Sequence, residues 1–161
     1  MKLPAQNPVE LTVRRIKEFG FYVNEALFEQ KVTENAGKSL QVEISLQLSF
    51  TLESNLVFLL VRVYYHFPKA EPDEIVTDIQ VQNVYEMDDL KRFQVGPSEI
   101  NLPSETIISI VALSLSHTRA LFAKNLAGTT LQENLMAVID PSRIAKHFFP
   151  RMFEDHSNQI N

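Results

Sequence analysis

The segment LQVEISLQLSFTLE, residues 40–53, alternates without a break between apolar and polar side chains. Its apolar positions are Leu40, Val42, Ile44, Leu46, Leu48, Phe50 and Leu52. Because successive side chains of a β-strand point to opposite faces, the pattern predicts a long strand with one apolar and one polar face. The strict period of two assigns the apolar face to the core and the polar face to water.

Three other segments, at 9–23, 56–67 and 75–87, also have the patterns of strands. The stretch 24–39, between the first two strands, contains the turn-prone sequence NAGK and is expected to be a loop. Short connections between successive strands favour an antiparallel meander of four strands.

Two of these strands carry a further signal. In the first, Arg15 and Lys17 interrupt the apolar face, which predicts a bulge or a bend near Arg15, Ile16 and Gly20. The third strand is apolar on both faces over 56–61, so something other than water is expected to cover its second face.

A long helix is predicted after the strands. Pro103 opens a run to Ala127 that contains neither glycine nor a further proline, with Asn101 or Ser104 as the expected cap and Gly128 at the expected end. The apolar side chains of this run occupy more than one stripe. One stripe is expected to lie on the sheet and the surplus to pack against another subunit.

A short terminal helix is predicted from Ser142 to Phe149, because Asp140 and Pro141 form a helix start and Pro150 limits its extent. The fold class is therefore α+β: a four-stranded antiparallel sheet, a long helix and a short C-terminal helix. We expect a single domain over 1–161, with flexible termini at 1–8 and 154–161.

Composition argues against several classes of protein. The 161 residues carry a net charge of -5 without a basic cluster, which gives nucleic-acid binding little electrostatic support. There is no cysteine, as suits a reducing compartment. The longest apolar run, 56–61, is far shorter than the roughly 20 residues that cross a bilayer. These features predict a soluble cytoplasmic protein without membrane insertion.

Signals of catalysis or metal binding are weak. The histidines are His66, His117, His147 and His156. None is paired with another at three or four residues' spacing, so we expect no metal and no cofactor. No nucleophile elbow or phosphate-binding loop occurs, and we expect no enzyme activity. The alternative is a small oligomeric enzyme or ligand-binding protein with Arg62, Tyr64 and His66, which share a strand face, at the junction of sheet and helix.

The order of these parts resembles that of the SecB family of export chaperones. The resemblance lies in VRRIKEFGFYV at 13–23, DIQVQNVYEM at 78–87, AGT at 127–129 and the IDP turn at 139–141, and it spans about residues 9–153. It implies a homotetramer built as a dimer of dimers. It also implies an ATP-independent chaperone that binds non-native polypeptides, in protein export with the SecA motor as a partner.

The resemblance also nominates site residues. The candidate client-binding side chains are Leu27, Phe28 and Val32 in the first loop, and Phe149, Met152 and Phe153 near the end. Simple anchoring of the loop, or packing of the C-terminal cluster on the long helix, is the alternative for these residues.

A departure from the family concerns the SecA contact. Val76 and Asp78 match two of its positions, but Gly20 and Asn24 occupy the two acidic ones. Half of the acidic patch is therefore missing, and a SecB-like chaperone for another client, such as an antitoxin, is the alternative to export.

Overall fold

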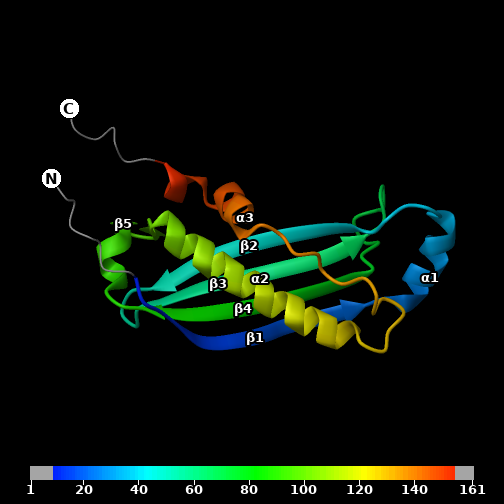
Figure 1. Ribbon diagram of the computed structural model, residues 1–161, viewed down its shortest axis with the longest axis horizontal. Helices are drawn as coiled ribbons and strands as arrows, with labels where there is room; N and C mark the ends of the chain where they lie inside the picture. The colour runs from blue at the N-terminus through cyan, green and yellow to red at the C-terminus, as the bar shows by residue number, and fades with distance from the viewer. Residues whose placement is uncertain (1–8, 155–161) are drawn as a thin grey trace.

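The computed structural model describes residues 9–154 and contains one main sheet with the two C-terminal helices on one of its faces (Figure 1). The strands are β1 (Leu11–Val23), β2 (Gln41–Thr51), β3 (Leu56–His66), β4 (Thr77–Met87), β5 (Gln94–Gly96) and β6 (Glu99–Ile100). The helices are α1 (Glu25–Glu34), α2 (Ser104–Leu126) and α3 (Pro141–Phe148), with short 3-10 turns η1 (Leu90–Phe93) and η2 (Pro150–Phe153). The termini predicted to be flexible, 1–8 and all but the first residue of 154–161, lie outside the described residues.

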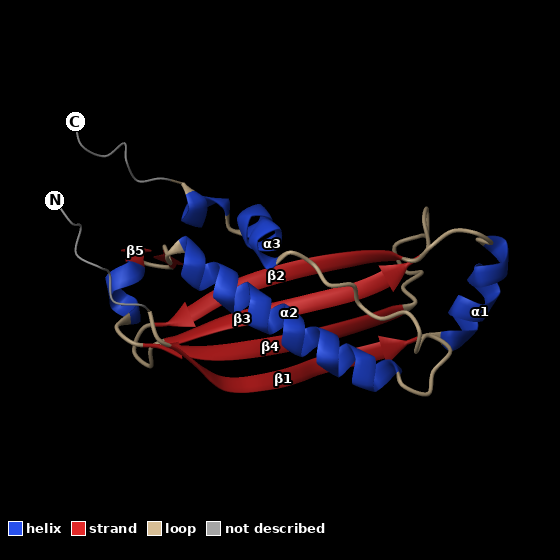
Figure 2. Ribbon diagram, in the orientation of Figure 1, coloured by secondary structure: helices blue, strands red, loops and turns tan. Residues whose placement is uncertain are grey.

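The main sheet is antiparallel, as predicted, and its strand order is β1-β4-β3-β2. The meander therefore comprises only β2, β3 and β4, whereas β1 pairs with β4 on the far side (Figure 2). The connection 24–40 is long enough to run past the end of the sheet from one edge to the other. As a consequence β2, the strand with the strict alternation, lies at an edge with one side unpaired.

The predicted loop after β1 contains helix α1, so that prediction was wrong. Asn24 caps this helix, because its Oδ1 accepts a hydrogen bond of 2.9 Å from the N–H of Leu27. A helix of ten residues is marginal by itself. Contacts with the β3–β4 connection hold it: Phe28 stacks on Phe67 at 6.0 Å, and Lys31 forms an ion pair of 2.9 Å with Glu74.

The irregularity predicted in the first strand is confirmed. The register of β1 against β4 shifts between Val13 and Arg15 and again between Glu18 and Gly20. Bulges and charged side chains discourage further strands from pairing with an edge. The bulges of β1 therefore discourage another strand from pairing with that edge. β2 has no such bulge, since it pairs with β3 in unbroken register.

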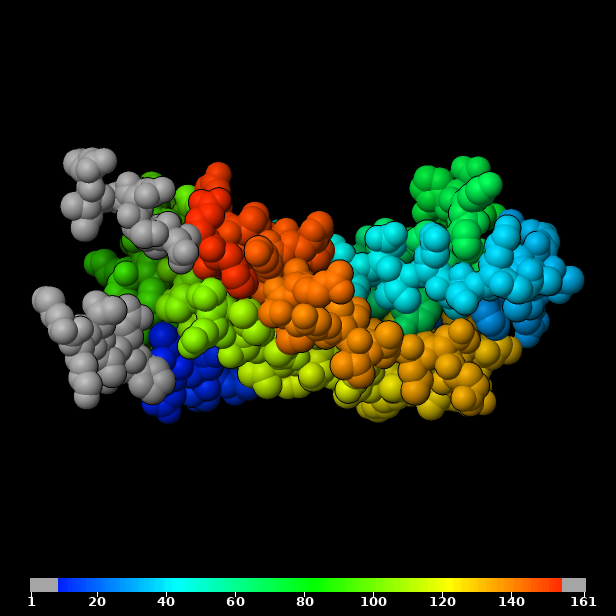
Figure 3. All heavy atoms as spheres, turned by 45° about the horizontal axis from the view of Figure 1, so that its top comes forward, coloured from blue at the N-terminus to red at the C-terminus, as the bar shows by residue number. Residues whose placement is uncertain are grey.

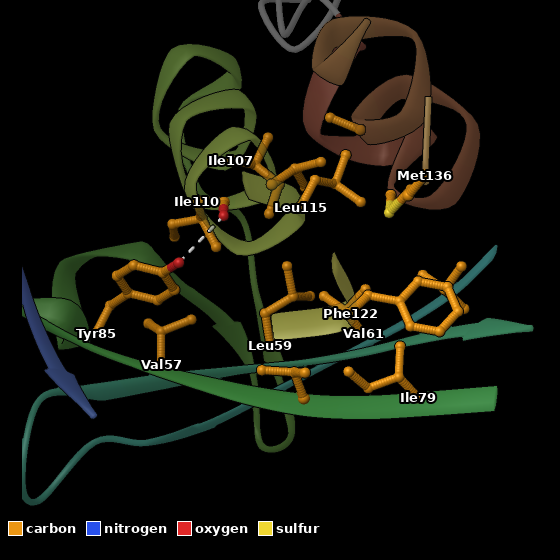
Figure 4. Close-up of a cluster of buried hydrophobic side chains, with 14 of the residues drawn as sticks. Val57, Leu59, Val61, Ile79, Tyr85, Ile107, Ile110, Leu115, Phe122 and Met136 are labelled. Atoms are coloured by element: carbon orange, nitrogen blue, oxygen red, sulfur yellow. Dashed lines mark hydrogen bonds between the residues drawn. The ribbon is translucent and has the colours of Figure 1, made fainter. Parts of the chain in front are cut away.

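The core lies between α2 and the inner faces of β3 and β4 (Figure 4). The inward side chains of β3 are all buried: Val57, Leu59, Val61, Val63 and Tyr65. Tyr85 of β4 contributes both packing and polarity, because its hydroxyl lies 2.7 Å from Oγ of Ser114 and 3.3 Å from the carbonyl oxygen of Ile110. Hydrogen bonding of this buried hydroxyl fixes the position of α2 over the sheet.

The ends of α2 only partly match expectation. Gly128 has φ of +81° just after the helix, as predicted for its end. At the start, Pro103 occupies the cap position and no side chain caps the helix, so neither Asn101 nor Ser104 has the predicted role.

The surplus apolar surface of α2 is smaller than the sequence predicted. The linker 127–140 and α3 fold back over the second stripe of the helix, where Met136 and Ala145 are buried. Leu113, 39 % exposed, is the large apolar side chain that α2 still presents to solvent. By length and composition alone α2 could cross a membrane, but much of it is buried in this core. Most of the apolar surface of α2 is therefore covered by other parts of the same chain.

The outer face of β3 is left partly open. Its alternate side chains, including Phe58 and Leu60, are only half-buried, and no element of residues 9–154 lies across them. The cover predicted for this face is therefore not supplied within the described part of the chain.

Buried polar groups between α2 and β4 make stability dependent on pH. The ring N–H at Nδ1 of His117 donates to Oδ1 of Asn83 over 2.8 Å, and burial lowers the pKa of His117 from its ordinary 6.5. Protonation therefore favours the unfolded chain. The contribution of neutral His117 to the stability of the fold is fully present above pH 6.5, its ordinary pKa. This contribution is lost as the pH falls through the lower pKa of the folded state.

We expect the melting temperature of the protein to fall between pH 7 and pH 5 and to fall less in the variant His117→Gln, which cannot take up that proton. Thermal unfolding followed by circular dichroism at both pH values measures the difference. An equal pH dependence in the two proteins would contradict this role of His117.

Candidate functional site

The apolar face of β2 forms a half-exposed strip. Its seven alternating apolar side chains, from Leu40 to Leu52, face the same side as the core, yet none of them is fully buried. Their partners on β3 are buried because α2 packs on β3, β4 and β1. In Figure 3 the β2 segment, in cyan, reaches the surface between the orange linker after α2 and the blue α1.

A wide hollow lies at one end of this strip, which we call the C-terminal hollow. It has a volume of about 840 Å³. Leu46, Leu48 and Phe50 of β2 form one side, and Phe149 and Met152 after α3 form the other. These side chains make the walls apolar.

The rim of the C-terminal hollow is charged. Arg151 and Glu99 form an ion pair of 2.9 Å, and both residues line the opening together with Glu154. Apolar walls and a polar rim are typical of surfaces that bind polypeptides and stay soluble.

A second hollow, the N-terminal hollow, lies at the other end of the strip and has a volume of about 270 Å³. Leu40 and Val42 of β2 form one side of it. Phe28 and Val32 of α1 form another, and Leu135 of the linker completes it. Val42, Val32 and Leu135 are exposed, so this end of the strip is accessible from solvent.

The structure places four of the six predicted client-binding residues at these two hollows. Phe28 and Val32 line the N-terminal hollow, and Phe149 and Met152 line the C-terminal one. Leu27 and Phe153 line neither hollow and pack against the core, which is the anchoring role left open for them.

Sequence reasoning missed the strand that connects the two hollows. Leu46, Leu48 and Phe50 were assigned to a covered face because the alternation is the same whether a face is buried or open. The position of β2 at an edge decides between the two cases, and strand order is not visible in the alternation. No sequence pattern indicated Val95, whose exposed side chain lines the C-terminal hollow.

The alternative site at Arg62, Tyr64 and His66 is not where the sequence placed it. These side chains alternate with the buried ones of β3 and therefore face away from α2. They line a shallow hollow of about 410 Å³ on the outer face. Arg62 is held by Asp78 at 2.6 Å and lies over the ring of Tyr64 at 4.9 Å, and the ring N–H at Nδ1 of His66 donates to the carbonyl oxygen of Phe67. Mutual contacts explain these polar groups without a ligand at the junction of sheet and helix.

The two positions predicted to contact SecA are poorly placed for it. Val76 is fully buried, so its side chain is not on the surface. Asp78 lies on the outer face, but its carboxylate accepts the hydrogen bonds of Arg62 at 2.6 to 3.1 Å. Among residues 9–154 no three histidine, aspartate or glutamate side chains are grouped so that they could hold a metal ion.

An antiparallel four-stranded sheet carrying one long and one short C-terminal helix on one face is the SecB-like fold. No protein-family model matches the chain, and no curated protein matches it by sequence. Among solved structures, the chain is similar to a SecB-like chaperone of Mycobacterium tuberculosis in complex with a ChAD peptide from the HigA1 antitoxin. The TM-score is 0.52 at 9% identity, covering 80% of this chain and 89% of the other. A protein of unknown function from Streptococcus agalactiae matches with a TM-score of 0.41 at 15% identity, over 74% and 89% of the two chains.

Proposed function

We propose that this protein is a non-enzymatic, ATP-independent chaperone that binds extended apolar segments of non-native polypeptides. The observation that carries the proposal is the strip of β2, a continuous row of half-exposed apolar side chains with a hollow at each end. Alternate side chains of an extended client fit such a row, and the unpaired edge of β2 offers backbone N–H and C=O groups beside it.

The similarity to a SecB-like chaperone solved with an antitoxin peptide supports polypeptides as the ligand class. Two kinds of client fit this proposal: export precursors handed to SecA, or a dedicated client such as an antitoxin. The dedicated client is favoured here, because Val76 is buried and the carboxylate of Asp78 is occupied by Arg62. We place this activity in the cytoplasm, where such clients are made.

We further propose that copies of the chain associate, as a dimer of dimers. Support comes from apolar side chains that the described residues leave exposed on two neighbouring elements: Leu113 on α2, and Val13 and Ile16 on β1. Polar and small side chains lie around Leu113 on the outer stripe of the helix, so association through this face is expected to depend on protein concentration.

The test of this function is suppression of aggregation. A chemically denatured reporter protein diluted into buffer without nucleotide is expected to aggregate several times more slowly when the protein is present at near-stoichiometric concentration. Light scattering follows the aggregation, and light scattering coupled to size exclusion gives the mass of the free protein. Unchanged aggregation at a tenfold excess would rule the chaperone function out.

A further inference from the structure

The outer face of the sheet, turned away from α2 (Figure 1), combines positive charges on β1 with apolar side chains on β3. The register of the strands aligns these side chains in rows across β1, β4 and β3. Two neighbouring rows each begin with a cation and end with an apolar side chain: Arg15, Val84 and Phe58 in the first, and Lys17, Gln82 and Leu60 in the second. These two rows, together with Phe19 and Gly20 beside them on β1, are called the outer patch.

The two cations of the outer patch form no ion pair within residues 9–154. Arg15 contacts only the uncharged amide oxygen of Gln82, at 3.5 Å. The ammonium group of Lys17 lies 5.0 Å from the centre of the Phe19 ring. Both cations are exposed, so a carboxylate from outside the chain can reach them.

The carboxylates around the outer patch do not neutralise it. Glu86 and Asp78, on the same face, are bound by Arg14 and Arg62. Glu18 of β1 lies on the inner face, where it accepts a hydrogen bond from α2. Other acidic residues lie at the two ends of the face: Glu10 and Asp88 at one end, and Glu71 at the other. The chain carries a net charge of -5, yet this part of its surface presents two unpaired positive charges.

The outer patch also exposes apolar surface. The ring of Phe19 is 51 % exposed, and Phe58 and Leu60 are half-buried with no element lying across them. No heavy atom apart from its chain neighbours lies within 4 Å of the place where Gly20 would carry a Cβ, so the surface is open there. An open surface with an aromatic ring, aliphatic side chains and an arginine has the composition of a protein interface.

We infer that the outer patch docks an extended acidic segment of a partner protein. Its carboxylates lie on Arg15 and Lys17, and its apolar side chains lie on Phe58 and Leu60. The two strands that carry these groups, β1 and β3, are separated only by β4, so the groups lie about 10 Å apart and one segment reaches both. Two unpaired cations are too few to hold a nucleic acid at physiological salt, and this favours an acidic peptide.

The outer patch and the strip of β2 lie on opposite faces of the sheet. A partner on the outer patch therefore leaves the strip free to hold a client. The inference goes beyond the proposed function and does not rest on it.

The test compares two fluorescein-labelled peptides, one alternating glutamate with leucine and the other glutamine with leucine. The wild-type protein is expected to bind the glutamate peptide about tenfold more tightly at low salt, because only its carboxylates pair with the two cations. This preference is expected to shrink as salt is added, since exposed charges are screened. Fluorescence anisotropy measures both affinities.

Gly20 offers a matched pair of variants, because a side chain fits there without a clash. Gly20→Glu places a carboxylate in the row next to that of Lys17 and is expected to abolish the preference for the glutamate peptide. Gly20→Gln adds a side chain of the same size without the charge and is expected to keep the preference. Circular dichroism checks that both variants fold.

Each outcome decides the inference. Equal binding of the two peptides by the wild-type protein overturns it, and so does an undiminished preference in Gly20→Glu or an equal loss in Gly20→Gln. If Gly20→Glu does not fold, Lys17→Gln replaces it and is expected to reduce the preference about threefold. A labelled oligothymidylate that binds more tightly than the glutamate peptide overturns the choice of an acidic segment. Gly20→Glu is expected to suppress aggregation of the reporter as the wild type does, so the proposed function is judged separately.

Discussion

A protein with Leu46→Thr and Leu48→Thr is expected to bind an extended apolar peptide about 30- to 100-fold more weakly than the wild type. Both leucines are half-buried side chains in the strip of β2 and line the C-terminal hollow. Burying a leucine fully contributes about 1.5–3 kcal/mol, and each side chain has roughly half of this left to gain from a client. Together they account for about 1.5–3 kcal/mol of binding free energy, a range that contains the stated change in Kd. Fluorescence anisotropy of a labelled peptide measures it.

The same strand supplies a matched control. Ser45 and Ser49 are exposed on the outer face of the sheet and line neither hollow, so Ser45→Thr with Ser49→Thr places the same residue type on the other face. Threonine suits strands at all four positions. The control is expected to bind like the wild type. If the leucine variant keeps its circular dichroism spectrum and also binds like the wild type, clients do not lie on this strip.

The sequence could predict those features of the fold that depend on residues close together in the chain. The alternation in β2, the bulges of β1 and the glycine after α2 are local patterns, and the structure has each of them at its predicted place. Strand order is not local. The pairing of β1 with β4 depends on the path of 24–40 around the sheet, and nothing in the strand patterns distinguishes it from pairing with β2.

The sequence could predict only part of the candidate site, because the rest depends on contacts between segments far apart in the chain. Phe149 and Met152 belong to an apolar cluster beside a polar segment, which is a visible pattern, and Phe28 and Val32 follow from the resemblance to a known family. The strip that lies between them was invisible, because its exposure follows from the placement of α2 over β3, β4 and β1.

Replacement of Phe122 by alanine is expected to lower the free energy of unfolding by about 3–5 kcal/mol, the cost typical of removing a buried phenylalanine. Phe122 is 1 % exposed and contacts two other rings edge-to-face, Phe21 at 6.3 Å and Tyr65 at 5.1 Å. It therefore joins α2 to β1 and β3 at once, and its loss leaves a cavity where three elements meet. Urea denaturation measures the change, and a loss below about 1 kcal/mol would contradict this packing.

The control on the same helix is Leu113→Ala, because Leu113 is exposed and alanine is the better helix former. In a single chain this change is expected to alter the free energy of unfolding by less than about 0.5 kcal/mol. If copies of the chain bury Leu113 between them, the cost becomes larger and rises with protein concentration, since association stabilises only the folded state. Comparing the two variants at several concentrations therefore separates the core of one chain from the proposed interface between chains.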